Sequence, residues 1–152
     1  MSASSDISEK YWSWTKPEIT SLTKPFWDAL LNHDLVIQKC KKCGEYQWYP
    51  KPNCAHCGSR DIEWVKISGK GQIYSYAKIE MVTGNSPLFN KEIPYYLALV
   101  ELDEGPRIYG MMTECDPNEV KIDSAVEVVF KDLEKDFTIP MFKPVKKPDL
   151  RK

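Results

Sequence analysis

Three features of the sequence predict a mainly β protein, in which an N-terminal helical arm and a four-cysteine ribbon precede a five-stranded barrel. Four of the five cysteines form two closely spaced pairs. After residue 70, apolar and polar residues alternate with a period of two in several short runs, which is typical of half-buried strands. Eleven prolines against seven glycines favour turns and extended segments over long helices. We therefore divide the chain into an aromatic arm and helix (1–35), a ribbon (36–66), a barrel (67–142) and a basic tail (143–152).

The N-terminal part contains one predicted helix. Thr23 is a residue type that caps helices, and Pro25 suits the first helical turn. An apolar stripe at helical spacing follows, made of Phe26, Trp27, Leu30 and Leu31. The helix is expected to run for about two to three turns and to end near Asn32.

Ahead of this helix lies a short segment with three large aromatic residues, Tyr11, Trp12 and Trp14. The segment has no core of its own, so the three rings must bury against another surface. Two surfaces are open at this point: the chain's own ribbon and a partner protein.

The two cysteine pairs are Cys40 with Cys43 and Cys54 with Cys57, and a glycine follows each pair. Thiolates two residues apart can turn onto one tetrahedral metal, and the glycine permits the positive φ of that turn. We predict one structural zinc ion, held by four sulfurs at about 2.3 Å; iron suits the same geometry. Disulfides are disfavoured because no export signal heads the chain, and a redox pair is disfavoured because a second matched pair is present. His56, inside the second pair, is interpreted as a surface residue.

The barrel is predicted from five strands: Gly71–Met81, Tyr95–Leu102, Arg107–Thr113, Val126–Phe130 and Phe137–Met141. Five short strands without a crossover helix favour a barrel of the OB type, although the same periodicity allows an SH3-like barrel. In the first strand, strict alternation gives two sides: one carries Ile73, Ser75, Ala77, Ile79 and Met81, and the other carries Tyr74, Tyr76 and Lys78. The 13-residue connection 82–94 carries Leu88 and Phe89 and either folds over the barrel mouth or contacts a ligand or subunit.

Charge and hydropathy exclude several classes of function. Residues 67–140 carry 7 basic and 13 acidic side chains, whereas the tail 141–152 carries 5 and 1. Nucleic-acid binding needs a basic groove, so the acidic barrel disfavours it. No apolar run approaches the roughly 18 residues of a membrane span, and we expect a cytoplasmic protein that does not bind membranes.

No catalytic constellation is visible in the sequence. Of the two histidines, His33 falls at the predicted helix end and His56 between two cysteines. A nucleophile elbow and a phosphate-binding glycine loop are both absent. Cys115 is the spare thiol, and its acidic neighbours are expected to raise its pKa and weaken it as a nucleophile. We expect no catalytic residue in this chain.

The order of these segments resembles the acyl-CoA-associated family, in which a rubredoxin-like zinc ribbon precedes an OB-fold. The resemblance covers roughly residues 11–143. It rests on the two cysteine pairs, Trp64, the Ser68–Gly71 entry to the first strand, Pro94-Tyr95 and the Glu104–Arg107 turn. This chain reads Ile122-Asp-Ser-Ala-Val126 where the family usually has a glycine, which leaves the type of that turn open.

The resemblance implies a non-catalytic accessory subunit that binds a thiolase-fold catalytic subunit, with a coenzyme A thioester as the shared ligand of the hetero-oligomer. Family members associate with thiolases, including those of anaerobic aromatic degradation, where the small subunit braces the thiolase and helps enclose coenzyme A. On this basis Tyr11, Trp12 and Trp14 are nominated as partner contacts. The nominated coenzyme A contacts are Lys70, Phe89 and Arg107, with the two basic residues meeting phosphate. The alternatives are a stand-alone acyl-CoA-binding protein and, less favoured, a module for single-stranded nucleic acid.

Overall fold

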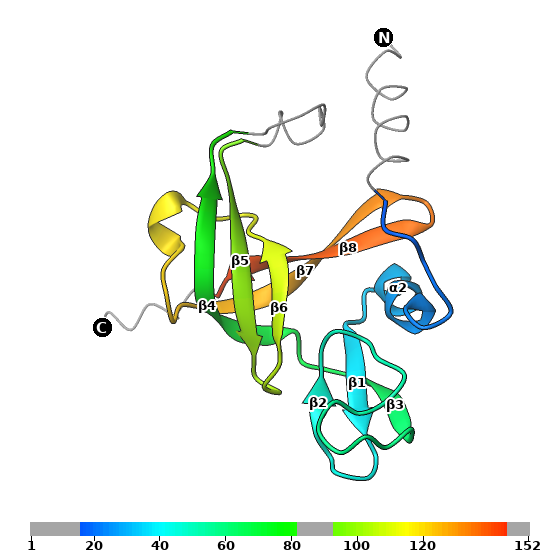
Figure 1. Ribbon diagram of the computed structural model, residues 1–152. Coiled ribbons are helices and arrows are strands. Elements are labelled where there is room, and N and C mark those ends of the chain that lie inside the picture. Colours follow the sequence, from blue (N-terminus) through cyan, green and yellow to red (C-terminus); the bar gives the residue numbers. More distant parts are fainter. Residues whose placement is uncertain (1–15, 82–92, 146–152) are drawn as a thin grey trace, which may run out of the picture.

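A computed structural model describes residues 16–81 and 93–145. It contains two antiparallel sheets, with one helix packed between them (Figure 1). Helix α2 (Lys24–Leu31) precedes the smaller sheet, of order β2-β1-β3, which comprises β1 (Val36–Cys40), β2 (Tyr46–Gln47) and β3 (Ile62–Lys66). The larger sheet has the order β6-β5-β4-β7-β8 and comprises β4 (Lys70–Ile79), β5 (Tyr95–Leu102), β6 (Arg107–Met111), β7 (Ala125–Glu134) and β8 (Phe137–Pro144). A 3₁₀ turn, η1 (Pro117–Glu119), lies between β6 and β7. The predicted mainly β fold class is confirmed.

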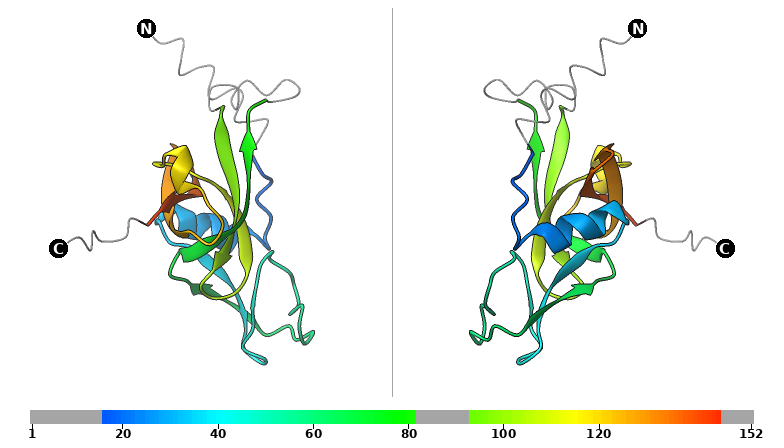
Figure 2. Two further views of the ribbon diagram at one scale, coloured as in Figure 1. Left: turned by 90° about the vertical axis from the view of Figure 1, so that its left-hand side faces the viewer. Right: turned by 90° about the vertical axis from the view of Figure 1, so that its right-hand side faces the viewer.

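Helix α2 connects the ribbon to the barrel. Phe26 is buried, and its ring centroid lies 4.7 Å from that of Trp48 in the ribbon. On the next residue, the Trp27 ring lies 5.3 Å from Phe137 at the start of β8. Figure 2 shows the ribbon at one end of the molecule, with the helix between it and the β7–β8 hairpin. The helix therefore belongs to one core with both sheets, which also contains Leu35, Ile37, Ile73, Val100 and Phe142.

The start of this helix differs in one detail from the sequence-based expectation. Thr23 occupies the N-cap position, but its side chain makes no capping hydrogen bond to the helix. Its Oγ1 instead accepts a hydrogen bond from the backbone N–H of Thr20 at 3.1 Å. The helix start is therefore set by Pro25 in the first turn and by the Thr20–Thr23 turn before it.

The last strand closes the five-stranded sheet into a barrel. Met112, just beyond β6, forms a parallel bridge with Phe142 of β8, and the Thr113 N–H donates to the Phe142 carbonyl at 2.8 Å. Gly110 makes this approach possible, because a Cβ at that position would lie 2.5 Å from the Phe142 ring. Phe142 is fully buried at this junction.

The expected alternation of the first barrel strand is wrong beyond Ile73. A register shift between Ile73 and Ser75 marks a β-bulge in β4. Ile73 pairs with Val100 and Tyr76 pairs with Ala98, and Val100 and Ala98 share the inner face of β5. The extra residue in the bulge therefore places Tyr76 and Lys78 on the side of the sheet that carries Ala98, although Ser75, Tyr76, Ala77 and Lys78 are all exposed.

The end of α2 is fixed to the β7–β8 hairpin through one carboxylate. His33, in the left-handed region with φ 58, lies with its Nε2 2.9 Å from Oδ1 of Asp132. Its ring also stacks on Phe130 at 5.3 Å. The hydroxyl of Thr138 donates to the same Oδ1 at 2.6 Å. The Asp132 carboxylate is thus hydrogen-bonded to both His33 and Thr138, and these bonds hold the helix end and the hairpin together.

The described ranges contain no helix with the length and apolar character needed to cross a lipid bilayer.

Candidate metal centre

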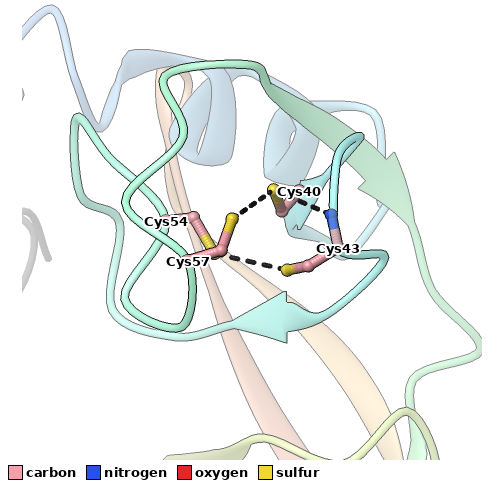
Figure 3. A group of neighbouring side chains, drawn as sticks. All are labelled: Cys40, Cys43, Cys54 and Cys57. Atoms are coloured by element: carbon pink, nitrogen blue, oxygen red, sulfur yellow. Dashed lines mark hydrogen bonds between the residues drawn. The ribbon is translucent and has the colours of Figure 1, made fainter.

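The four paired cysteines come together at the tip of the ribbon (Figure 3). Their Sγ atoms all lie within 4.8 Å of one another, and the pairs Cys40–Cys57 and Cys43–Cys54 lie at 3.6 Å. A disulfide requires about 2.05 Å, so neither pair is bonded. A tetrahedron with zinc–sulfur bonds of about 2.3 Å has edges of about 3.8 Å. The arrangement therefore fits one tetrahedral metal ion.

Both cysteine pairs use the same backbone turn. The N–H of Gly44 donates to the Cys40 carbonyl at 2.9 Å, and the N–H of Gly58 donates to the Cys54 carbonyl at 3.0 Å. The two glycines have φ values of 79° and 77°, as the sequence predicted. No atom lies within 4 Å of an added Cβ at either position, so there is room for a side chain. Glycine is favoured because of the positive φ.

Backbone N–H groups stabilise the thiolate form of two ligands. The N–H of Cys43 approaches the Cys40 Sγ at 3.5 Å and is the main reason that the pKa of Cys40 falls to about 6. The backbone N–H of Cys57 is the main cause of the lowered pKa of Cys54, and the N–H of His56, at 3.3 Å, adds to it. Thiolates are the metal-binding form of cysteine, so the backbone prepares these sulfurs for a cation.

The His56 side chain is exposed, as expected, and is not part of the sulfur cluster. The ring of Tyr46 lies 5.0 Å from the ammonium of Lys39, which fixes one of the basic side chains near the cysteines.

A buried glutamine pair behind the cysteines was not anticipated from the sequence. Nε2 of Gln47 donates to Oε1 of Gln38 at 2.7 Å. Gln38 also exchanges hydrogen bonds with the backbone of Lys51, at 2.9 and 3.1 Å, and Oε1 of Gln47 accepts from the Ala55 N–H at 2.9 Å. The sequence does contain a signal for it: Gln38 lies two residues before Cys40 in one strand, so alternation places its side chain on the same buried face as the cysteine.

Two of the nominated coenzyme A contacts lie on one outer face of the barrel. Lys70 begins β4 and Arg107 begins β6, and the pairs Gln72–Glu101 and Glu101–Arg107 place them on the same side of the sheet. Arg107 already donates to Glu101 at 3.0 Å and stacks over the Tyr74 ring at 3.6 Å. Phe89 falls in the sequence between the end of β4 and the start of β5. Like Tyr11, Trp12 and Trp14, it lies outside the described residues.

His33, Thr138 and Cys115 are further reactive side chains within the described ranges. His33 and Thr138 both bond Asp132, so the hydroxyl lies on the carboxylate and not on the imidazole, unlike a nucleophile beside its base. The pKa of the Cys115 thiol is raised in the expected direction, but burial is the main cause, and Glu119 and then Asp116 add to it.

A four-sulfur ribbon followed by a closed five-stranded barrel defines a zinc-ribbon OB-fold protein. Residues 27–63 match the rubredoxin-like zinc ribbon domain of ChsH2, and residues 64–131 match its C-terminal OB-fold domain. This match decides for the OB type over the SH3-like alternative. The chain belongs to the DUF35 family.

Curated relatives support this assignment. A DUF35 domain-containing scaffold protein of Methanocaldococcus jannaschii is 35% identical over 103 residues, which are 67% of this chain and 71% of that protein. The benzoylsuccinyl-CoA thiolase subunit BbsA of Geobacter metallireducens is 27% identical over 83% of this chain and 84% of its own length. A probable enoyl-CoA hydratase alpha subunit of Thermomonospora curvata is 37% identical over 78% of this chain, and the aligned part spans only 36% of that subunit.

A solved structure agrees over almost its whole length. The matching chain of an Ltp2–ChsH2(DUF35) aldolase superimposes with a TM-score of 0.75 and 32% identity. The superposition covers 85% of this chain and 98% of that one.

Proposed function

We propose that this chain is a non-catalytic, zinc-binding accessory subunit of a thiolase-type acyl-CoA enzyme complex. The observation that carries the proposal is the likeness to the DUF35 chain of an aldolase complex over 98% of that chain. The subunit would brace a catalytic subunit that makes or cleaves a carbon–carbon bond in a β-keto or β-hydroxy acyl-CoA. The similarity to a benzoylsuccinyl-CoA thiolase subunit supports thiolysis of an aromatic substrate as one such reaction.

The metal in this proposal is structural. Cys40, Cys43, Cys54 and Cys57 would hold one zinc ion, and all four positions of a tetrahedron are then filled by sulfur. Such a closed shell leaves no position for a substrate, and what zinc supplies is folding free energy. The Gln38–Gln47 pair and the two glycine turns hold the sulfurs in place.

The partner interface is proposed to include the aromatic arm and the β7–β8 hairpin. Lys16, the first described residue, forms an ion pair with Glu134, and its ammonium lies 5.4 Å from the Phe137 ring. The chain before Lys16 therefore starts beside this hairpin. Five residues span at most about 18 Å, so a surface that binds Tyr11 and Trp14 must come within that distance of Lys16.

Affinity purification from the native host, followed by mass spectrometry, tests the subunit proposal. We expect a thiolase-fold protein to co-elute at a fixed stoichiometry. A Trp12→Ala/Trp14→Ala variant should lose the partner but keep its zinc, because two aromatic anchors are removed from the interface and none from the metal centre. Ser13→Ala, between the two tryptophans, is the matched control. Unchanged partner affinity in the double variant would remove the arm from the interface.

Coenzyme A contact is tested separately on the assembled complex. Lys70 and Arg107 share the outer face of β4–β6, and Lys70 forms no ion pair within the described ranges, which leaves its charge available to a phosphate. Lys70→Ala and Phe89→Ala should raise the KM for the CoA thioester several-fold, whereas Lys121→Ala, on the loop before β7, should not. An unchanged KM in all variants would reject these contacts.

The second candidate function is a stand-alone acyl-CoA-binding protein. The same basic pair on one outer face favours it, because that face exists without a partner. Isothermal titration of the isolated, zinc-loaded chain with acetyl-CoA separates the two functions. Tight binding by the chain alone supports the stand-alone protein, and binding that requires the catalytic subunit supports the accessory subunit.

A further inference from the structure

The barrel has a pocket near the end of β4, away from the metal centre and from Lys70 and Arg107. Its volume is about 370 Å³, near the lower end of the range of ligand pockets. The lining residues come from β4, β5, β7, β8 and the β6–η1 connection, and they include Lys78, Tyr96, Met112, Cys115, Lys131 and Met141.

The pocket lies beside a part of β4 that is not paired with β7. The register of the two strands covers Lys70–Gln72, and Ile73 bonds the 123–124 turn. Beyond the bulge, the described part of β4 makes no ladder hydrogen bond to β7. The bulge also places Lys78 opposite Tyr96 of β5, and both residues line the pocket.

The floor of the pocket is apolar and adaptable. Met112 and Met141 line the pocket and are both 6% exposed, and Met111 and Tyr96 add further apolar surface to the lining. Methionine side chains are unbranched and polarizable and fit apolar groups of different shape. Such a floor favours a hydrocarbon chain or a single ring.

Two lysines, Lys78 and Lys131, are among the residues that line the pocket. Lys131 lines the pocket and lies on the same face of β7 as Val129, the residue that pairs with Met141. The Lys131 ammonium forms no ion pair with any described carboxylate. Lys78 is paired with Glu80 at 2.6 Å, but both side chains are well exposed, and such a pair is weak and exchanges readily. Glu114 is the acidic residue in the lining, so two lysines face one carboxylate. Cys115, with its raised pKa, adds no negative charge at neutral pH.

We propose that this barrel-wall pocket binds a small amphipathic anion, with its apolar body on Met112 and Met141 and its anionic head group on Lys131 and Lys78. Carboxylates and phosphate monoesters share this head-group chemistry. The proposal does not depend on the accessory-subunit function, because the residues that line the pocket all belong to this chain.

Methyl NMR of the full, zinc-loaded chain labelled at methionine tests the proposal. The probes are octanoate, octyl phosphate and 1-octanol. Octanoate or octyl phosphate should shift the methyl signals of Met111, Met112 and Met141 saturably, while Met81, which is 77% exposed and outside the pocket, stays unchanged. The tighter of the two anions identifies the head group as carboxylate or phosphate. The neutral 1-octanol should bind about tenfold more weakly.

Two variants separate charge from shape. Lys131→Ala should weaken binding of the anions about tenfold, and Lys135→Ala, in the exposed turn after β7, should leave it unchanged. Equal binding of octanol and octanoate, unaffected by Lys131→Ala, would overturn the anion site. Absence of any saturable shift with all three probes would overturn the pocket altogether. The ligand pocket would also be overturned if Phe89→Ala shifted the signals of the same three methyls and no probe bound, because the chain's own 82–92 segment would then fill the space.

Discussion

Gln47 donates its side-chain amide to Oε1 of Gln38 at 2.7 Å, and both side chains are buried directly behind the cysteine pairs. Gln38 bonds the backbone of Lys51 and Gln47 bonds that of Ala55, so the pair ties β1 and β2 to the loop that presents Cys54 and Cys57. The two halves of the metal centre are thus joined by a polar contact that does not touch the metal.

Removing one member of this pair should weaken the metal centre. Gln47→Leu leaves the Ala55 N–H and the Gln38 oxygen with a lost partner inside the protein, which costs about 1–3 kcal/mol of stability. Zinc affinity should fall about tenfold, because the loop carrying two ligands is held less firmly. Thermal unfolding and competition with a chelator measure both effects. Gln72→Leu, on the exposed face of β4, is the control, and equal behaviour of the two variants would contradict this role.

Removal of a zinc ligand should unfold more than the ribbon. Cys40→Ser or Cys57→Ser should abolish stoichiometric zinc binding, because metal affinity in such sites is folding free energy. Leu35 and Ile37 share one core with Val100 of the barrel, so the loss should reach the barrel as well. Circular dichroism and metal analysis test this, together with activity of the assembled complex. His56→Ala should keep its zinc; a cysteine variant that is folded and fully active without metal would refute the structural role.

The contact that closes the barrel should tolerate no side chain at Gly110. An alanine Cβ would lie 2.5 Å from a ring atom of the fully buried Phe142, so Gly110→Ala should destabilise the chain by about 1–3 kcal/mol. Denaturant unfolding gives the value. Adding Phe142→Leu to this variant should cost less than Phe142→Leu costs alone, because the smaller side chain relieves the clash. Additive effects of the two substitutions would show that the steric contact is absent.

Asp132 gives stability an acid-side pH dependence. The Thr138 hydroxyl, and then His33, hold the pKa of this carboxyl below its ordinary value. A carboxyl whose pKa is lower in the folded state stabilises the protein above its unfolded pKa, and the stabilisation is lost as the pH falls through the folded pKa. The Tm difference between the unmodified chain and Asp132→Asn should therefore be largest near neutral pH and shrink in acid. A Tm difference for Asp132→Asn that stays constant with pH would reject the linkage.

Local patterns in the sequence predict most of the fold, and long-range contacts account for what they miss. Spacing alone identifies the four cysteines and their glycine turns, and alternation locates Tyr95–Leu102 with the bounds that β5 has. The bulge at Tyr74 is invisible to alternation, because one extra residue reverses every later side chain without changing the residue types. The bond between His33 and Asp132 joins positions 99 residues apart, and no local signal announces it.

Native mass spectrometry of this chain, co-expressed with a thiolase-fold protein from the same host, tests the central claim most directly. One spectrum gives the partner, the stoichiometry and the metal content together. We predict a hetero-oligomer whose mass contains both chains and one zinc ion for each copy of this chain. Two separate species, with this chain alone and zinc-loaded, would contradict the accessory-subunit account and favour the stand-alone acyl-CoA-binding protein.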